Sequence, residues 1–231
     1  MMAFPAHGFV LLAMPKCAST SIESALAPYA SLVIDRPPSR KHLGCSGFTK
    51  RIAPGLAADG HPRDSYELVT MFRDPIAWLE SWWRYRARLD DGSDNSTHDL
   101  TFERFARQYV DGDPTAPTPR GRPGQFLTVD GVVEVDRVFA VERPGAWLPW
   151  FSERLGTAVS VERRNVSGQR VAPELTDSVR AELVDYFAPE YAVQSRLLDT
   201  GEWAGARGTP LAVPTRPRKA RHLPHGHAQK S

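Results

Sequence analysis

A lysine and three hydroxyl side chains gather in one short segment, Pro15-Lys16-Cys17-Ala18-Ser19-Thr20-Ser21. The segment follows an apolar run over residues 9–14 and precedes a stretch with helical spacing. The N–H groups of a first helical turn lack partners inside the helix, so a strand-to-helix turn of this kind can bind an anion, aided by the helix dipole. Lys16 would add a positive charge to it. We predict a phosphate or sulfate site; the simpler alternative is that Ser19 or Thr20 only caps the helix.

A second segment, Arg73-Asp74-Pro75, follows the apolar run over residues 66–72. If that run is a strand parallel to the first, Arg73 reaches the same edge of the sheet as the first segment. Ser81 lies about two turns into the helix that is expected to follow. A guanidinium together with a hydroxyl suits a terminal phosphate. The simpler alternative is that Arg73 pairs with Asp74 at the turn.

The elements that must position these segments are strands that alternate with helices. Apolar spacing predicts strands over residues 8–14, 31–34, 66–72, 132–141 and 158–162, and helices over residues 19–29, 75–89, 101–110, 146–155 and 176–198, the last interrupted at Pro189. Such alternation predicts an α/β fold with a central, mostly parallel sheet flanked by helices. Residues 111–124 are rich in Pro and Gly and are expected to form an exposed loop. Ligands in such folds bind beyond the carboxyl ends of the strands, where both segments are placed.

Length and composition favour one globular domain with little sign of a membrane segment. The 231 residues suit one α/β domain, and no apolar stretch approaches the roughly 20 residues that cross a bilayer. The run over residues 9–14 lacks the basic start and apolar length of a signal peptide. Cys17 and Cys45 are too few for a disulfide framework, which fits a reducing compartment. We expect a cytoplasmic protein without a transmembrane segment, of unknown oligomeric state.

The carboxyl-terminal segment is basic. From Gly205 onward there are six Lys and Arg residues and no Asp or Glu, so subtracting six from the net charge of +2 leaves about −4 on the rest. We expect a domain over residues 1–203 and a basic, disordered tail over residues 204–231. The body of the chain is mildly acidic, so an anion site in it must be built locally. The basic tail could contact an anionic lipid, a nucleic acid or an anionic acceptor, but we expect a solvated tail and no nucleic-acid partner. The histidines between His222 and His227 lack a folded frame for a metal ion.

The two segments resemble the donor-binding motifs of one enzyme family. The run Pro15–Ser21 resembles the 5'-phosphosulfate loop of sulfotransferases that use 3'-phosphoadenosine-5'-phosphosulfate (PAPS), particularly the carbohydrate-type and bacterial group, whose pattern is P-K-C-G-[ST]-[ST]. Ala18 stands where that family usually has Gly. The run Val69–Trp83 resembles the family's 3'-phosphate motif, R-[DN]-P-x-x-[RW]-x-x-S, with Trp78 at the position often held by Arg. Weaker likeness extends from Phe9 to Trp203.

The resemblance implies a P-loop-like three-layer fold and the transfer of a sulfuryl group from PAPS to a hydroxyl or amine acceptor, such as a carbohydrate or small metabolite. It implies that the donor is bound by Lys16, Cys17, Ala18, Ser19, Thr20, Ser21, Arg73 and Ser81. Lys16 and the loop amides would stabilise the departing phosphate. His42 would be the base on the acceptor side. A sulfuryl group carries less negative charge than a phosphoryl group, so we expect no metal requirement.

Two other functions stay open at this point. A nucleotide-dependent kinase of the P-loop type would also bind phosphates, although the pattern G-x-x-x-x-G-K-[ST] is not found here. A catalytically inactive protein could keep the pocket for PAPS or its product while Ala18 and a misplaced base abolish turnover. The aromatic residues Trp82, Trp83 and Tyr85 could stack on a sugar. The spacing of Trp78, Trp82, Tyr85 and Leu89 instead predicts that they form a buried stripe of a helix.

Overall fold

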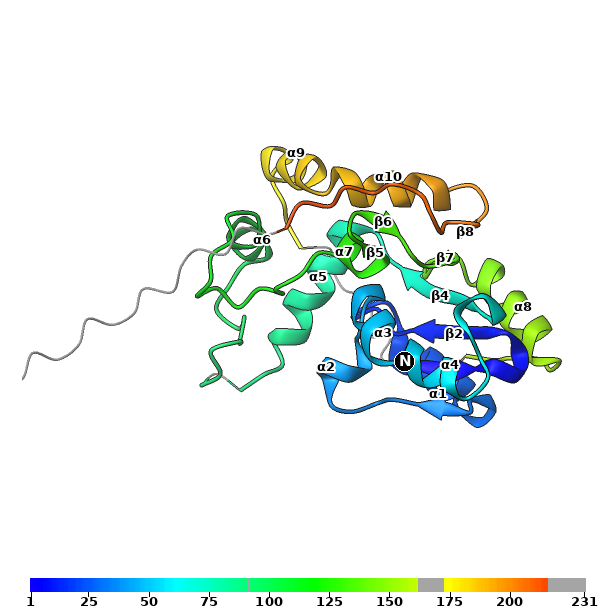
Figure 1. The fold of residues 1–231 in the computed structure, drawn as a ribbon. Coiled ribbons are helices and arrows are strands. Elements are labelled where there is room, and N and C mark those ends of the chain that lie inside the picture. Colours follow the sequence, from blue (N-terminus) through cyan, green and yellow to red (C-terminus); the bar gives the residue numbers. More distant parts are fainter. Residues whose placement is uncertain (91, 162–172, 216–231) are drawn as a thin grey trace, which may run out of the picture.

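The computed structural model describes residues 1–90, 92–161 and 173–215 (Figure 1). Within them the fold is α/β, with a mixed six-stranded sheet and a second, two-stranded sheet. The strands are β1 (Met2–Phe4), β2 (Phe9–Leu12), β3 (Leu32–Val33), β4 (Glu67–Phe72), β5 (Thr128–Val129), β6 (Val132–Val133), β7 (Arg137–Ala140) and β8 (Glu202–Ala204). The helices are α1 (Ser19–Leu26), α2 (Pro38–Lys41), α3 (Cys45–Arg51), α4 (Ala53–Ala58), α5 (Pro75–Arg86), α6 (Phe102–Val110), α7 (Pro123–Leu127), α8 (Pro144–Leu155), α9 (Asp177–Tyr186) and α10 (Ala188–Leu197). Three short 3-10 helices, Pro5–His7, Ala27–Tyr29 and Arg63–Ser65, complete the order.

The large sheet has the strand order β3-β1-β2-β4-β7-β8. Strands β2, β4 and β7 are parallel neighbours, whereas the other three pairings are antiparallel, so the prediction of a mostly parallel sheet is wrong. The reason lies in β1 and β8, two strands that are too short to show a sequence pattern and that pair only in antiparallel fashion. A tight turn ending at Gly8, with φ 69°, reverses the chain between β1 and β2, and a two-strand reversal of this kind must be antiparallel.

The central strands are buried on both faces, as parallel strands covered by helices are expected to be. All four residues of β2 are buried, and five of the six residues of β4 are buried. Aromatic side chains of α8 cover part of the sheet: the ring of Trp150 lies 5.2 Å from that of Phe9 and 5.5 Å from that of Phe139. This packing joins α8 to β2 and β7, the two strands on either side of β4.

Most of the longer predicted elements are confirmed. Strands β2 and β4 and helices α1, α5, α6 and α8 lie where the apolar spacing placed them. The last helical block is interrupted between α9 and α10, close to the predicted break. The strand predicted near residues 158–162 is not formed over residues 158–161, and residue 162 lies outside the described part. The short helices α2, α3 and α4 were not predicted, since each is too brief to show helical periodicity.

The segment over residues 111–124 corrects another prediction, because much of it is buried. Thr118 is 5% exposed and Arg122 is also 5% exposed. The Tyr109 hydroxyl donates to the carbonyl of Gly121 at 2.9 Å, and the Arg122 guanidinium pairs with Glu190 of α10 at 2.6 Å. The Pro and Gly content predicted irregular backbone correctly, but it carried no information about this buried ion pair.

The packed body extends beyond the boundary predicted at residue 203. Residues 204–215 return along the small sheet, where Leu211 N–H donates to the carbonyl of Gly131 at 2.8 Å and Val132 bridges to Pro210. Ala206 in this segment is fully buried. The rest of the predicted tail, residues 216–231, lies outside the described residues.

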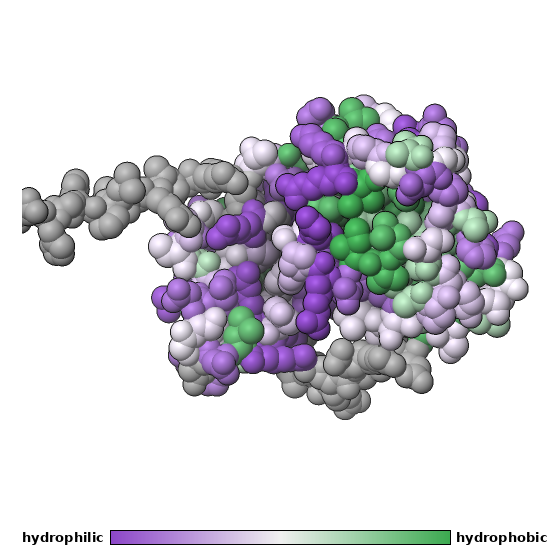
Figure 2. Space-filling view, turned by 60° about the horizontal axis from the view of Figure 1, so that its bottom comes forward, coloured by the Kyte–Doolittle hydropathy of each residue, from purple (hydrophilic) through white to green (hydrophobic). Residues whose placement is uncertain are grey.

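The carboxyl ends of the parallel strands face α5. In Figure 1 the arrowheads of β2 and β4 point toward the side of the molecule on which α5 and α6 lie. Figure 2 shows another face, on which hydrophobic residues gather beside hydrophilic ones. Among the described helices, none is long and apolar enough to cross a membrane.

Candidate anion-binding site

The loop between β2 and α1 has an unusual backbone. Lys16 and Ala18 both have left-handed conformations, with φ 65° and 55°. This region costs a residue with a Cβ atom roughly 1–2 kcal/mol. Turns of this kind aim successive backbone N–H groups into a concavity that suits an anion. Strain of this type gathers at functional sites, and here it supports the prediction of an anion site.

The first turn of α1 carries no side-chain cap. Its N-cap residue is Ala18, which has no side-chain hydrogen bond, so the alternative that Ser19 or Thr20 caps the helix is wrong. Ser21 N–H donates back to the carbonyl of Ala18 at 3.1 Å. Alanine is a poor N-cap because it offers no acceptor. The remaining first-turn donors therefore favour an external acceptor.

Replacing Ala18 by Gly should stabilise the protein. Relief of the left-handed strain is worth roughly 1–2 kcal/mol, and the greater freedom of Gly in the unfolded chain removes about 0.4–1 kcal/mol of that gain. We expect a net gain of about 0.5–1 kcal/mol, or about 1–4 °C in Tm. The control is Ala25→Gly within α1, which should destabilise by about 1 kcal/mol. Thermal unfolding showing equal losses in both variants would contradict the strain at Ala18.

Lys16 folds over the aromatic side chains of α5. Its Nζ lies 3.9 Å from the ring centre of Tyr85 and 5.5 Å from that of Trp82. The pKa of Lys16 is lowered to about 8, mainly by burial and to a smaller extent by the charges of Arg88 and Arg73. Binding of an anion here would offset the repulsion between Lys16 and these two cations. Lys16 is thus poised at the loop to receive a negative group.

Arg73 lies against the same loop, at the end of β4. Its Nη1 donates to the carbonyl of Lys16 at 3.2 Å, and its Nε lies 4.0 Å from Oε1 of Glu142. Asp74 does not serve as its partner at the turn. The Asp74 carboxylate instead caps α5 by accepting from Ala77 N–H at 2.8 Å. The structure therefore brings Arg73 and Lys16 together, as the order of the strands predicted.

Helix α5 presents Ser81 on the side that faces the loop. Trp78 fixes this orientation, because its Nε1 donates to the carbonyl of Pro15 at 3.0 Å. Residues three and four positions apart share a helix face, so Ser81 and Trp82 flank the direction of Trp78. Ser81 is half-buried.

His42 follows α2 and is tied to the end of β2. Its Nδ1 donates to the carbonyl of Ala13 at 2.7 Å, which leaves the lone pair on Nε2 free to accept a proton. Burial lowers the pKa of His42, despite the hydrogen bond to Ala13, so the ring is neutral near pH 7. Lys41, beside it, pairs with Glu23 of α1 at 2.6 Å. This ion pair links α2 to α1 and helps to position His42.

Cys17 has a structural part in the loop. Its side chain is 1% exposed, and its N–H donates to the carbonyl of Met14 at 3.4 Å. Burial raises the pKa of its thiol, which is therefore neutral. In this conformation Cys17 supplies no donor to a ligand, unlike its neighbours. Cys17 and Cys45 are both free and buried.

Sequence reasoning missed several residues at this site. Tyr85 was expected in a buried stripe, but it is 47% exposed, whereas Trp78 is 4% exposed as predicted. The helix face that carries these residues does point into the protein. At its carboxyl-terminal end, however, Tyr85 lies under Lys16 of the loop and not in the core. Arg86 and Arg88, which follow Tyr85 directly, add positive charge here. The sequence feature that could have identified them is the series of arginines at positions 84, 86 and 88, near the end of the predicted helix.

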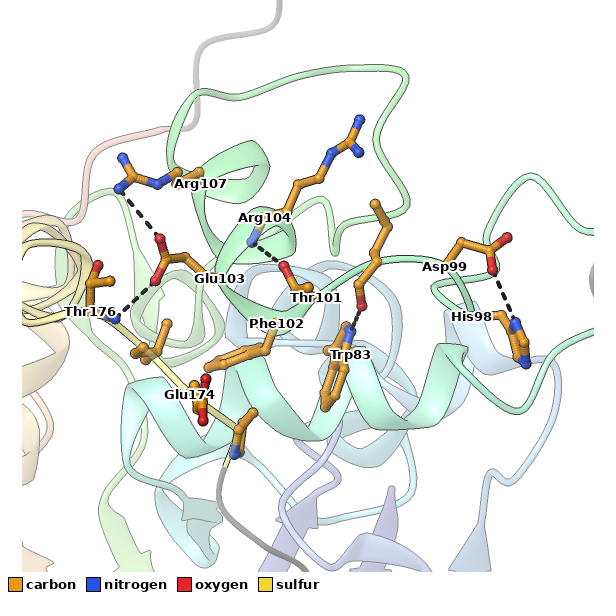
Figure 3. Close-up of a pocket in the computed structure, with 13 residues that line it drawn as sticks. Trp83, His98, Asp99, Thr101, Phe102, Glu103, Arg104, Arg107, Glu174 and Thr176 are labelled. Carbon is orange, nitrogen blue, oxygen red and sulfur yellow. Dashed lines mark hydrogen bonds and ion pairs between the residues drawn. The ribbon is translucent and has the colours of Figure 1, made fainter.

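A separate cavity of about 1070 Å³ lies on another side of α5 (Figure 3). Trp83 and Phe102 line it, and the Trp83 Nε1 donates to the carbonyl of Leu100 at 2.8 Å. Glu103 also lines the cavity. Its carboxylate accepts from Thr176 N–H at 2.9 Å and pairs with Arg107 (Figure 3). The cavity shares no lining residue with the anion site described above.

Two further findings concern cofactors and relatives. Across residues 1–90, 92–161 and 173–215, no group of three or more His, Cys, Asp or Glu side chains could hold a metal ion. Comparison of the chain with models of known protein families, with curated proteins and with solved structures found no match.

Proposed function

We propose that the protein is a sulfotransferase that moves a sulfuryl group from PAPS to a hydroxyl or amine acceptor. The observation that carries the proposal is that Arg73 contacts the loop of Lys16 at one edge of the sheet. The strained, uncapped start of α1 suits the phosphosulfate, and Arg73 with Ser81 suits the 3'-phosphate. The proposal includes a P-loop-like three-layer arrangement, which the parallel strands β2 and β4 support.

In the proposed reaction an acceptor oxygen attacks the sulfur in line with the bridging oxygen. The bond between the sulfur and that oxygen breaks, and 3'-phosphoadenosine-5'-phosphate departs with the electron pair. Lys16 leaves the Tyr85 ring and offsets the charge that develops on the bridging oxygen, together with the N–H groups of Ser19 and Thr20. The acceptor proton passes to Nε2 of His42, which carries the lone pair because Nδ1 donates to the carbonyl of Ala13.

Thermal unfolding with 3'-phosphoadenosine-5'-phosphate tests the donor assignment. At 100 times its Kd this ligand should add about 2.7 kcal/mol, or about 5–10 °C in Tm. AMP, which lacks the 3'-phosphate, should give a much smaller shift. Arg73→Ala should abolish the shift, because the guanidinium that is expected to bind the 3'-phosphate is gone.

The control is Arg196→Ala, which removes an exposed arginine that lies over Trp203, away from the loop. That variant should keep the full shift. A shift with ATP and Mg²⁺ alone would overturn the proposal in favour of phosphoryl transfer. A shift with the bis-phosphate but no transfer to any acceptor in a broad panel would instead favour a binding protein without catalysis.

A further inference from the structure

Three buried donors at the site have no hydrogen-bond partner among the described residues. They are Nε of Arg73, Nε1 of Trp82 and Nη1 of Arg86. Buried donors without partners are costly, and protein groups of this kind are normally satisfied. All three are donors, so the ligand that satisfies them must offer acceptors, as an anion does. Arg73 is already part of the proposed donor site, which leaves Trp82 and Arg86.

Trp82 and Arg86 form a pair on one side of α5. The guanidinium carbon of Arg86 lies 5.3 Å from the ring centre of Trp82. At about 100° per residue, Arg86 projects about 140° from Ser81, the predicted 3'-phosphate ligand on the same helix. An anion bound between Trp82 and Arg86 is therefore separate from the one expected at Ser81.

The surroundings of this pair are positively charged and partly aromatic. Burial lowers the pKa of Arg86, Tyr85 raises it, and the positive charge of Arg120, in the segment before α7, has a smaller lowering effect. The exposed ring of Tyr85 lies beside this pair, under the Nζ of Lys16. A guanidinium group, an indole N–H and an exposed aromatic ring thus lie next to the lysine that would handle the reacting group.

We propose that this subsite, made of Trp82, Tyr85 and Arg86, binds an acid group of the acceptor. The acceptor is then a cyclic hydroxyl compound that carries a carboxylate or a similar anion, such as a sugar acid. Its anion takes the donors of Trp82 and Arg86, and its ring lies on Tyr85. This inference rests on the proposed function for the identity of the ligand as an acceptor, but the anion subsite itself can be tested without it.

The test is a titration with glucuronate, followed by the NMR resonance of the Trp82 indole N–H, which Trp82→Phe identifies. We expect a saturable shift in the wild type, both without and with saturating 3'-phosphoadenosine-5'-phosphate. Methyl glucoside, which lacks the charge, should give none. Arg86→Gln should weaken glucuronate binding at least tenfold, and Arg86→Lys should recover part of it, because a single ammonium cannot replace the guanidinium fork.

Arg84→Gln is the matched control, since Arg84 lies on the same helix, pairs with Glu80 and projects away from Trp82. It should change the Kd for glucuronate less than twofold. The proposal is overturned if glucuronate does not shift the resonance, if Arg86→Gln binds it as the wild type does, or if the bis-phosphate displaces it. If the bis-phosphate fails to bind while glucuronate binding still depends on Arg86, the donor assignment falls and the anion subsite stands.

Discussion

Lys16→Ala should lower the rate of sulfuryl transfer by about 10²–10³-fold, the usual cost of losing one charged donor to a developing oxyanion. The fold should survive, because Lys16 is a partly buried cation beside Arg73 and Arg88, and its removal relieves repulsion. The rate is measured as release of 3'-phosphoadenosine-5'-phosphate from PAPS, with the acceptor found for the wild type or with water. A loss below tenfold would contradict a role for Lys16 in the transfer step.

The same lysine predicts a pH dependence. Since the pKa of Lys16 is lowered to about 8, the side chain is charged below pH 8 and neutral above it. We expect kcat/KM for PAPS to fall about tenfold per pH unit above that value, because kcat/KM reports the free enzyme. On the acid side it should fall only below the lowered pKa of His42. Lys16→Arg, whose charge persists to high pH, should remove the alkaline decline.

Glu190→Gln should destabilise the protein by about 3–5 kcal/mol, the usual cost of breaking one partner of a buried ion pair. Glu190 is fully buried, its side chain accepts from Arg122 at 2.6 Å, and Oε1 also accepts from Gly124 N–H at 3.2 Å. The substitution keeps the shape of the side chain but leaves the guanidinium of Arg122 without its charge partner. We expect a fall in Tm of about 6–20 °C.

Glu182→Gln is the control for this result. Glu182 also pairs with an arginine, Arg107 at 3.8 Å, but both side chains are 43% or more exposed. Exposed pairs contribute about 0–1 kcal/mol, so its Tm should hardly change. Equal effects in the two variants would show that the Arg122–Glu190 pair is not a main support of the segment that carries Arg120.

The amino-acid sequence by itself determined the larger elements and the two segments of the proposed donor site. Strand β4 and helix α5 are long enough for their apolar spacing to be unambiguous, and Pro75 marks the start of the helix. The strand-to-helix position of Lys16 followed from the same spacing. That Lys16 and Arg73 meet followed from two parallel strands that end at one edge, a rule of such folds that needs no coordinates.

Only the tertiary structure decided what meets these segments. Strands β1 and β8 are three residues long, too short for a pattern, yet they make the outer part of the sheet antiparallel. Ala18 revealed its left-handed backbone only in the folded loop, because nothing in the residue type predicts it. The exposure of Tyr85 likewise depends on where the helix ends relative to the core, and periodicity reports only which face turns inward. Local spacing thus specified the elements, while contacts between distant segments specified the surroundings of the site.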